Sequence, residues 1–278
     1  MTILKKTIYR IKPVNLRHHI ILSLFIMFIV IALPSKVYSL YLPQNAIAVG
    51  PAATSQCITG YVKPELLSTS SNQTLSVLGT IDLTKSTVKL DPFMVLPGSK
   101  FTARPTNSSF SIDLLDSKGG TLARYPFDPK VYTNISQNKD KMALLSEAIP
   151  YVPCLKEIVI SKDNKELASR NVDDYPPKVR IIFPIGGEIL TGNITVRWQA
   201  TDADGGNLTY FVLYSTDTGR SWQDVASDIK DTETTVNMAA LPGTTVGLFR
   251  IIATDGVNTG ISDSNSTFNV PSTSITAG

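Results

Sequence analysis

The sequence predicts an all-β protein of two tandem β-sandwich domains, preceded by an N-terminal signal or anchor helix. Its 278 residues suffice for two domains of ordinary size, each roughly 100 residues. From about residue 70, apolar side chains recur at every second position in short runs, as half-buried strands require. Polar turn formers separate these runs, and a long apolar stretch occurs only in the first 39 residues.

The leader, residues 1–39, is basic at its start and then apolar. Residues 20–33 are apolar apart from Ser23, which is typical of a secretory signal sequence. As a helix, this run would be about 21 Å long, against a hydrocarbon core of roughly 30 Å. We favour a signal peptide cleaved after Ser39, with cleavage after Ala48 or an uncleaved membrane anchor as alternatives. Because positive charge precedes the apolar run, each alternative exports the remaining chain, either free or tethered to the membrane by this segment.

The charge and histidine content exclude several classes of function. Six of the 26 basic residues lie in the leader, which has no acid, so 20 basic residues face 23 acidic ones in the rest. Such a balance gives no reason to expect a nucleic-acid partner. Both histidines, His18 and His19, also lie in the leader. Catalytic triads with histidine and His-ligated zinc are therefore excluded from the exported part, and we expect no cofactor.

Export changes how the two cysteines are interpreted. Thiols outside the cytoplasm are usually oxidised, so Cys57 and Cys154 are predicted to form one disulfide, which joins the start of the first domain to one of its late strands. Six glycosylation sequons also occur, which matter only if the host glycosylates asparagine and could equally reflect a composition rich in Asn, Ser and Thr. They are Asn72, Asn107, Asn134, Asn193, Asn207 and Asn265.

The first domain is expected over residues 70–172, after an extended linker over residues 40–69. Its alternating apolar positions are Leu75, Val77, Ile81, Leu83, Val88, Leu90, Phe110, Ile112 and Leu114. The tetrad 162–165, Lys-Asp-Asn-Lys, predicts a hairpin between residues 158–160 and 167–168. Residues 141–148 suit either a helix or a strand.

The second domain is predicted over residues 177–270, followed by a polar tail over 271–278. Two acids and two prolines in 173–177 interrupt strand pairing and mark the boundary. Apolar side chains alternate from Ile194 to Ala200, and strands of this length between polar turns are typical of a β-sandwich of roughly 100 residues.

Several segments of this second domain resemble the immunoglobulin-like or fibronectin-type-III-like modules of secreted prokaryotic hydrolases and surface proteins. The segments are Pro177–Pro184, Gly186–Glu188, Ile194–Trp198, Ser215–Trp222 and Phe249–Gly256. They cover about a third of the chain. The resemblance implies an accessory, non-catalytic pair of domains.

Two turns carry residues that suit more specific roles. Ser215, Asp217, Gly219 and Trp222 fit the pattern S-x-D-x-G-x-S-W, known as the Asp-box, in which Ser and Asp side chains bind turn amides. A single copy favours a structural turn. The loop 202–207 offers oxygen ligands from Asp202, Asp204 and Asn207, a weak calcium candidate because a turn of Asp, Gly and Asn needs no metal.

We therefore expect a secreted or cell-surface, non-catalytic protein that binds or spaces an unknown protein or glycan partner at the cell envelope. One alternative is a carbohydrate-binding module that stacks sugars on exposed tyrosines. The candidate tyrosines are Tyr41, Tyr61, Tyr125, Tyr132, Tyr151 and Tyr175. A second alternative is a small glycoside hydrolase with two converging carboxylates, one of them with a raised pKa.

Overall fold

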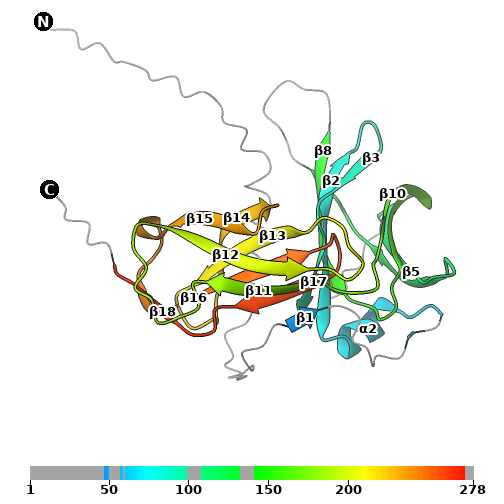
Figure 1. Ribbon diagram of the computed structural model, residues 1–278. Helices are drawn as coiled ribbons and strands as arrows, with labels where there is room; N and C mark the ends of the chain where they lie inside the picture. Colours follow the sequence, from blue (N-terminus) through cyan, green and yellow to red (C-terminus); the bar gives the residue numbers. More distant parts are fainter. Residues whose placement is uncertain (1–46, 50–56, 59, 99–107, 132–140, 273–278) are drawn as a thin grey trace, which may run out of the picture.

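A computed structural model describes residues 47–49, 57–58, 60–98, 108–131 and 141–272 of the chain. The described part is all β apart from one α-helix of seven residues and one short 3-10 helix. Its strands form four sheets, which pack in pairs as two sandwiches lying side by side (Figure 1). The predicted all-β fold with two tandem β-sandwiches is therefore confirmed.

The first sandwich joins two antiparallel sheets, in the orders β3-β2-β8-β7, with β4 on β2, and β10-β9-β5-β6. Their strands are β2 (Gln73–Asp82), β3 (Thr87–Leu90), β4 (Met94–Pro97), β5 (Phe110–Leu115), β6 (Thr121–Pro126), β7 (Lys130–Val131), β8 (Met142–Pro150), β9 (Glu157–Lys162) and β10 (Lys165–Asn171). The predicted alternation places Leu75, Val77 and Ile81 in the core, fully buried. Each such side chain contributes roughly 1.5–3 kcal/mol by leaving water.

Two local predictions in this domain are decided by backbone geometry. Strands β9 and β10 form the predicted hairpin, with Lys162 opposite Lys165. The two residues between them, Asp163 and Asn164, both adopt positive φ, which the tight turns of two-residue hairpins require. The ambiguous segment 141–148 is a strand, because β8 pairs with β2 along its whole length.

The second sandwich places the three-stranded sheet β11-β12-β15 on the sheet β17-β16-β13-β14. Its strands are β11 (Lys178–Phe183), β12 (Asn193–Thr201), β13 (Thr209–Ser215), β14 (Gln223–Ile229), β15 (Glu233–Asn237), β16 (Thr244–Thr254), β17 (Thr259–Asp263) and β18 (Phe268–Val270), and β18 pairs with β16. A core of Trp198, Tyr214 and Phe249 lies between the sheets. Grouping the third, sixth and seventh strands in one sheet is the immunoglobulin-like arrangement.

The segment 40–69 differs from the extended linker that the sequence predicts. Residues Ile47–Val49 form β1, which pairs with β17 and extends the sheet of the second domain (Figure 1). Residues Pro64–Ser70 form the helix α2, which begins at a proline and buries Leu67 in the core of the first domain. The sequence offered no clear signal for β1, since three residues cannot show an alternation.

The leader, Asn107 and Asn134 lie outside the described residues. Within the described part, no helix is long and apolar enough to cross a membrane.

The predicted disulfide joins Cys57 to Cys154, which are separated by 97 positions in the chain. Cys154 lies in the connection between β8 and β9, not in a strand, and has positive φ. The bridge therefore ties the segment that follows β1 to the β8–β9 connection of the first domain.

Replacing both cysteines by serine should lower the free energy of unfolding by about 4–5 kcal/mol, because the unfolded chain regains the entropy of a long closed loop. Urea denaturation followed by circular dichroism measures this loss. Reductant should destabilise the parent protein and leave the double variant unchanged. Equal stability of the two proteins would mean that the bridge does not form.

Candidate functional site

The most elaborate polar arrangement in the described part lies where the two sandwiches meet. Arg170, near the end of β10, directs its guanidinium at three backbone carbonyls. Its Nη1 donates to the oxygens of Asp91 (2.8 Å) and Gly256 (2.9 Å), and its Nη2 lies 3.4 Å from the oxygen of Leu90. The guanidinium also lies 4.4 Å above the ring of Phe93. One side chain of the first domain thereby binds the backbone of both.

Backbone groups continue this contact between the domains. The amide of Phe93 donates to the oxygen of Gly256 (2.8 Å), and the hydroxyl of Thr254 donates back to the oxygen of Phe93 (2.8 Å). The amide of Val95 on β4 also donates to the hydroxyl of Thr259 on β17 (2.9 Å). These bonds are buried, so breaking them would leave unsatisfied groups and cost more than exposed bonds.

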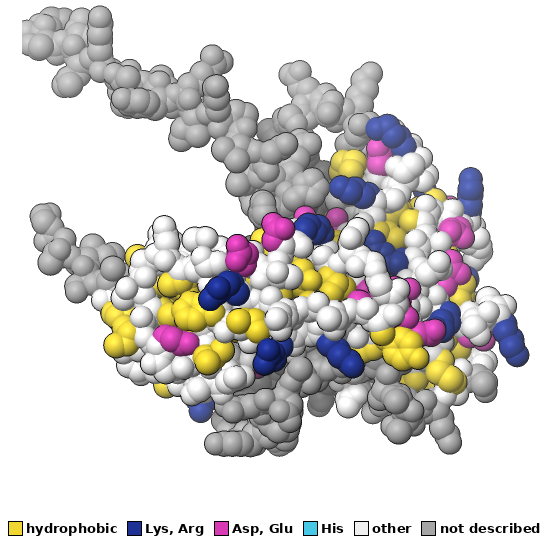
Figure 2. All heavy atoms as spheres, in the orientation of Figure 1, with side chains coloured by type: hydrophobic (Ala, Val, Ile, Leu, Met, Phe, Trp, Pro, Cys, Tyr) yellow, Lys and Arg dark blue, Asp and Glu magenta, His cyan; other side chains and the backbone are white. Residues whose placement is uncertain are grey.

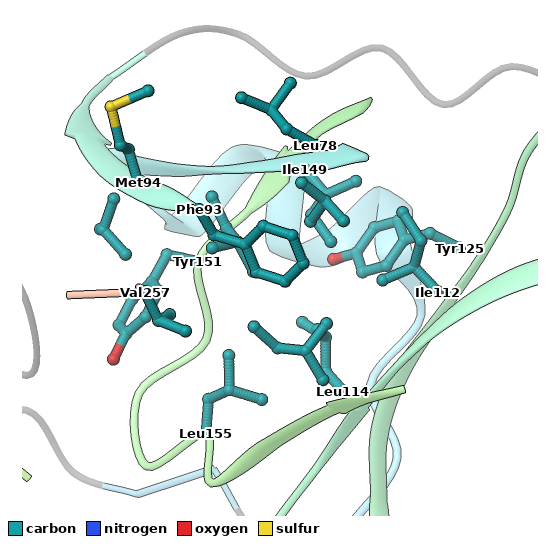
Figure 3. Close-up of a cluster of buried hydrophobic side chains, with 14 of the residues drawn as sticks. Leu78, Phe93, Met94, Ile112, Leu114, Tyr125, Ile149, Tyr151, Leu155 and Val257 are labelled. Carbon is teal, nitrogen blue, oxygen red and sulfur yellow. The ribbon is translucent and has the colours of Figure 1, made fainter. Parts of the chain in front are cut away.

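Apolar side chains fill the rest of this surface, which we call the junction. Val257 of the second domain is 1% exposed and lies beside Tyr151 of the first, in the cluster around Phe93 (Figure 3). Ile252 and Ile261 of the second domain belong to the same buried cluster. The two domains therefore share a core, and independent motion would expose it to water.

Burial lowers the pKa of Arg170, while the nearby charges of Asp91 and Asp255 raise it. The sequence indicated none of this, because an arginine on a polar edge strand is ordinarily a solvated charge.

Substituting Arg170 by lysine should reduce stability by roughly 2–3 kcal/mol, since an ammonium lacks the planar fork that reaches these carbonyls while it stacks on the ring of Phe93. We expect the single unfolding transition to separate into two as the domains uncouple. Calorimetry resolves the transitions, and tryptophan fluorescence reports the second domain, which holds both tryptophans. The matched control is Arg180→Lys, an exposed side chain on β11, which should leave the unfolding profile unchanged.

The predicted Asp-box turn forms at the hairpin between β13 and β14. Ser215 Oγ donates to Asp217 Oδ1 (2.8 Å) and accepts from the amide of Gly219 (2.8 Å). Ser221 donates to Asp217 through its amide (2.9 Å) and its hydroxyl (2.6 Å). Burial raises the pKa of Asp217, but these hydrogen bonds outweigh it, so the pKa lies below its usual value.

Trp222 closes the turn. A Cβ at Gly219, which has positive φ, would lie 3.1 Å from the indole, so glycine is needed both for the backbone and for the ring. Arg250 lies 4.2 Å above this indole and makes a bidentate ion pair with Asp263. The Asp-box residues are thus engaged with one another and with the sheet.

Replacing Asp217 by alanine should reduce stability by about 1–2 kcal/mol, since three hydrogen bonds are lost at the turn. The loss should shrink as the pH falls, because a group with a lowered pKa stabilises the fold only while it is ionised. Thermal unfolding at several pH values measures both effects. Asp231→Ala, in the exposed turn after β14, serves as the control and should change stability by less than about 0.5 kcal/mol.

The acidic side chains of the calcium candidate bind backbone amides of the chain itself. Asp202 Oδ1 accepts the amide of Asp204 (2.9 Å), and Asp204 Oδ2 accepts the amide of Tyr175 (2.7 Å). Asn207 and Lys230 line an open hollow beside this loop, where the ammonium opposes a cation. Across the described ranges, no three acidic, Cys or His side chains are placed to hold a metal ion.

Carboxylates in the turns and on the sheets mostly bind neighbouring groups of the chain. Backbone amides donate hydrogen bonds to the carboxylates of Asp82, Asp116, Glu188 and Asp255. Arginines form ion pairs with Asp113 and Asp263. Burial raises the pKa of Asp255 to about 6, as a general acid would need. However, its Oδ1 binds two amides and its Oδ2 is buried, so neither oxygen is open to a substrate.

The proposed tyrosine platform is only partly on the surface. Tyr61 and Tyr175 are 57% and 59% exposed, but Tyr125 and Tyr151 are buried in the first core, which corrects their assignment as surface aromatics. Tyr41 and Tyr132 lie outside the described residues.

The four described sequon asparagines, Asn72, Asn193, Asn207 and Asn265, are all exposed. Figure 2 shows basic and acidic side chains interspersed over one face, without a large patch of either sign.

Comparison with known proteins adds little to this geometry. No protein-family model matches the chain, and no curated protein sequence matches it. One similar solved structure contains the fibronectin(III)-like modules of CbhA from Clostridium thermocellum, with 10% identity, a TM-score of 0.27, and coverage of 81% of this chain and 95% of the other. A likeness at this TM-score carries no argument, so the fold assignment rests on the sheets themselves.

Proposed function

We propose that this is a secreted or cell-surface, non-catalytic protein whose two sandwiches form a rigid spacer that presents a binding surface at the cell envelope. The observation that carries the proposal is the junction. Arg170 and the buried bonds around Phe93 couple two complete sandwiches through a shared core. A spacer needs this coupling, whereas two modules on a flexible linker would not require it.

The engagement of the polar side chains supports a structural role. The Asp-box residues stabilise a hairpin, and the carboxylates named above cap turns or pair with arginine. The disulfide and the exposed sequon asparagines suit an oxidising, extracellular setting. The partner chemistry that we propose is a protein or glycan of the envelope, bound on the mixed-charge surface.

Residual dipolar couplings of the exported chain test the rigid spacer. Both sandwiches should report one common alignment tensor at neutral pH, because they tumble as a single body. Arg170→Ala should give two tensors of different magnitude. Two different tensors in the parent protein would rule out the spacer.

Intact-mass analysis of the protein purified from its native cells tests export. We expect loss of the leader mass, a gain of two hydrogens on reduction, and extra mass where sequons carry glycans. A full-length reduced protein recovered from the cytoplasm would contradict the proposal.

A further inference from the structure

The turn from Asp255 to Asn258 contacts the first domain through the carbonyl of Gly256 and the buried side chain of Val257. Asp255 Oδ1 accepts the amides of Val257 (2.7 Å) and Asn258 (2.8 Å), which shapes the turn. Within this turn, the carbonyl of Gly256 accepts hydrogen bonds from the amide of Phe93 and the guanidinium of Arg170, both in the first domain. The geometry of the junction therefore depends on the Asp255 carboxyl.

Three buried polar atoms at this turn have no hydrogen-bond partner among the described residues. They are Asp255 Oδ2, Asn258 Oδ1 and Tyr151 Oη. Asn258 is fully buried, and its Nδ2 donates to the carbonyl of Asp173 (2.9 Å). An ionised carboxylate oxygen without a donor is unfavourable in such a site, whereas a protonated one is neutral and becomes a donor itself.

Charged and titratable groups surround Asp255 from each element that packs against it. Arg170 of β10 favours the ionised carboxylate, and so do the amides of the turn and the side chain of Asn258. Burial opposes ionisation most strongly, and Asp173 between the domains adds repulsion. Tyr151 stays neutral, because burial raises its pKa to about 12. Asp91 lies near Arg170, and Asp202 near Asp173.

We propose that the Asp255–Asn258 turn is a proton-operated latch, which holds the junction more tightly when the Asp255 carboxyl is neutral. The pKa of this carboxyl is raised from 3.8 to about 6 in the folded protein. Its stabilising effect is therefore complete below about pH 4 and is lost as the pH rises through about 6. The latch goes beyond the spacer role, since it controls how often the junction opens and not the average arrangement of the domains.

Hydrogen exchange at the amides of Phe93 and Val95 measures opening of the junction, because both donate to the second domain. After correction for the intrinsic exchange rate, their protection factors should fall about tenfold between pH 5 and pH 7.5. In Asp255→Asn, which keeps the acceptor and cannot ionise, protection should be independent of pH over this range. Asp116→Asn removes an exposed turn carboxylate and should retain the parent profile.

A tenfold fall that persists in Asp255→Asn, or constant protection in the parent protein, would overturn the latch. Should that variant fail to fold, Asp173→Asn provides the test: removing a like charge should shift the fall in protection to lower pH, and an unshifted midpoint counts against the proposal. Failure of the spacer is distinguishable, because it appears in the dipolar couplings at neutral pH, whereas the latch concerns only the pH dependence of exchange.

Discussion

Buried carbonyl groups at the junction need donors, and this requirement organises the contact between the two domains. The junction brings loops of the two sandwiches together, and loop backbone has no neighbouring strand to pair with. Arg170 meets the requirement because a planar guanidinium can serve several oxygens while its face lies on the ring of Phe93. The apolar contact of Val257 then excludes water, which strengthens each hydrogen bond around it.

A glycine on β17 lets the chain that enters the second domain lie close to that strand. A Cβ at Gly260 on β17 would clash with the carbonyl oxygen of Pro177, at the start of the second domain. The chain entering the second domain therefore lies directly against that strand. Arg170, on β10 a few residues before Pro177, is held near the junction by the same short connection.

Sequence patterning predicted what depends on alternation and turn chemistry. The runs around Val77 and Val196 became buried strands, and the polar tetrad after Ile160 became a tight hairpin. The Asp-box turn followed from residue types that bind nearby amides. The junction could not be predicted in this way, since Arg170 acts on carbonyls 79 and 86 positions away and carbonyls leave no signature in a sequence. The buried tyrosines were missed for a related reason: tyrosine suits core and surface equally well, and only tertiary packing decides.

Strand β1 has a consequence for how this protein can be divided. The second sandwich is completed by residues that precede the whole first domain, so the consecutive strands β11–β18 are not a self-contained fragment. A fragment that begins at the boundary near residue 177 would lack β1 and expose the edge of β17. The unpaired amides of that edge could then bind another extended peptide. The order of segments along the chain thus interlocks the two units, and the natural building block is the pair.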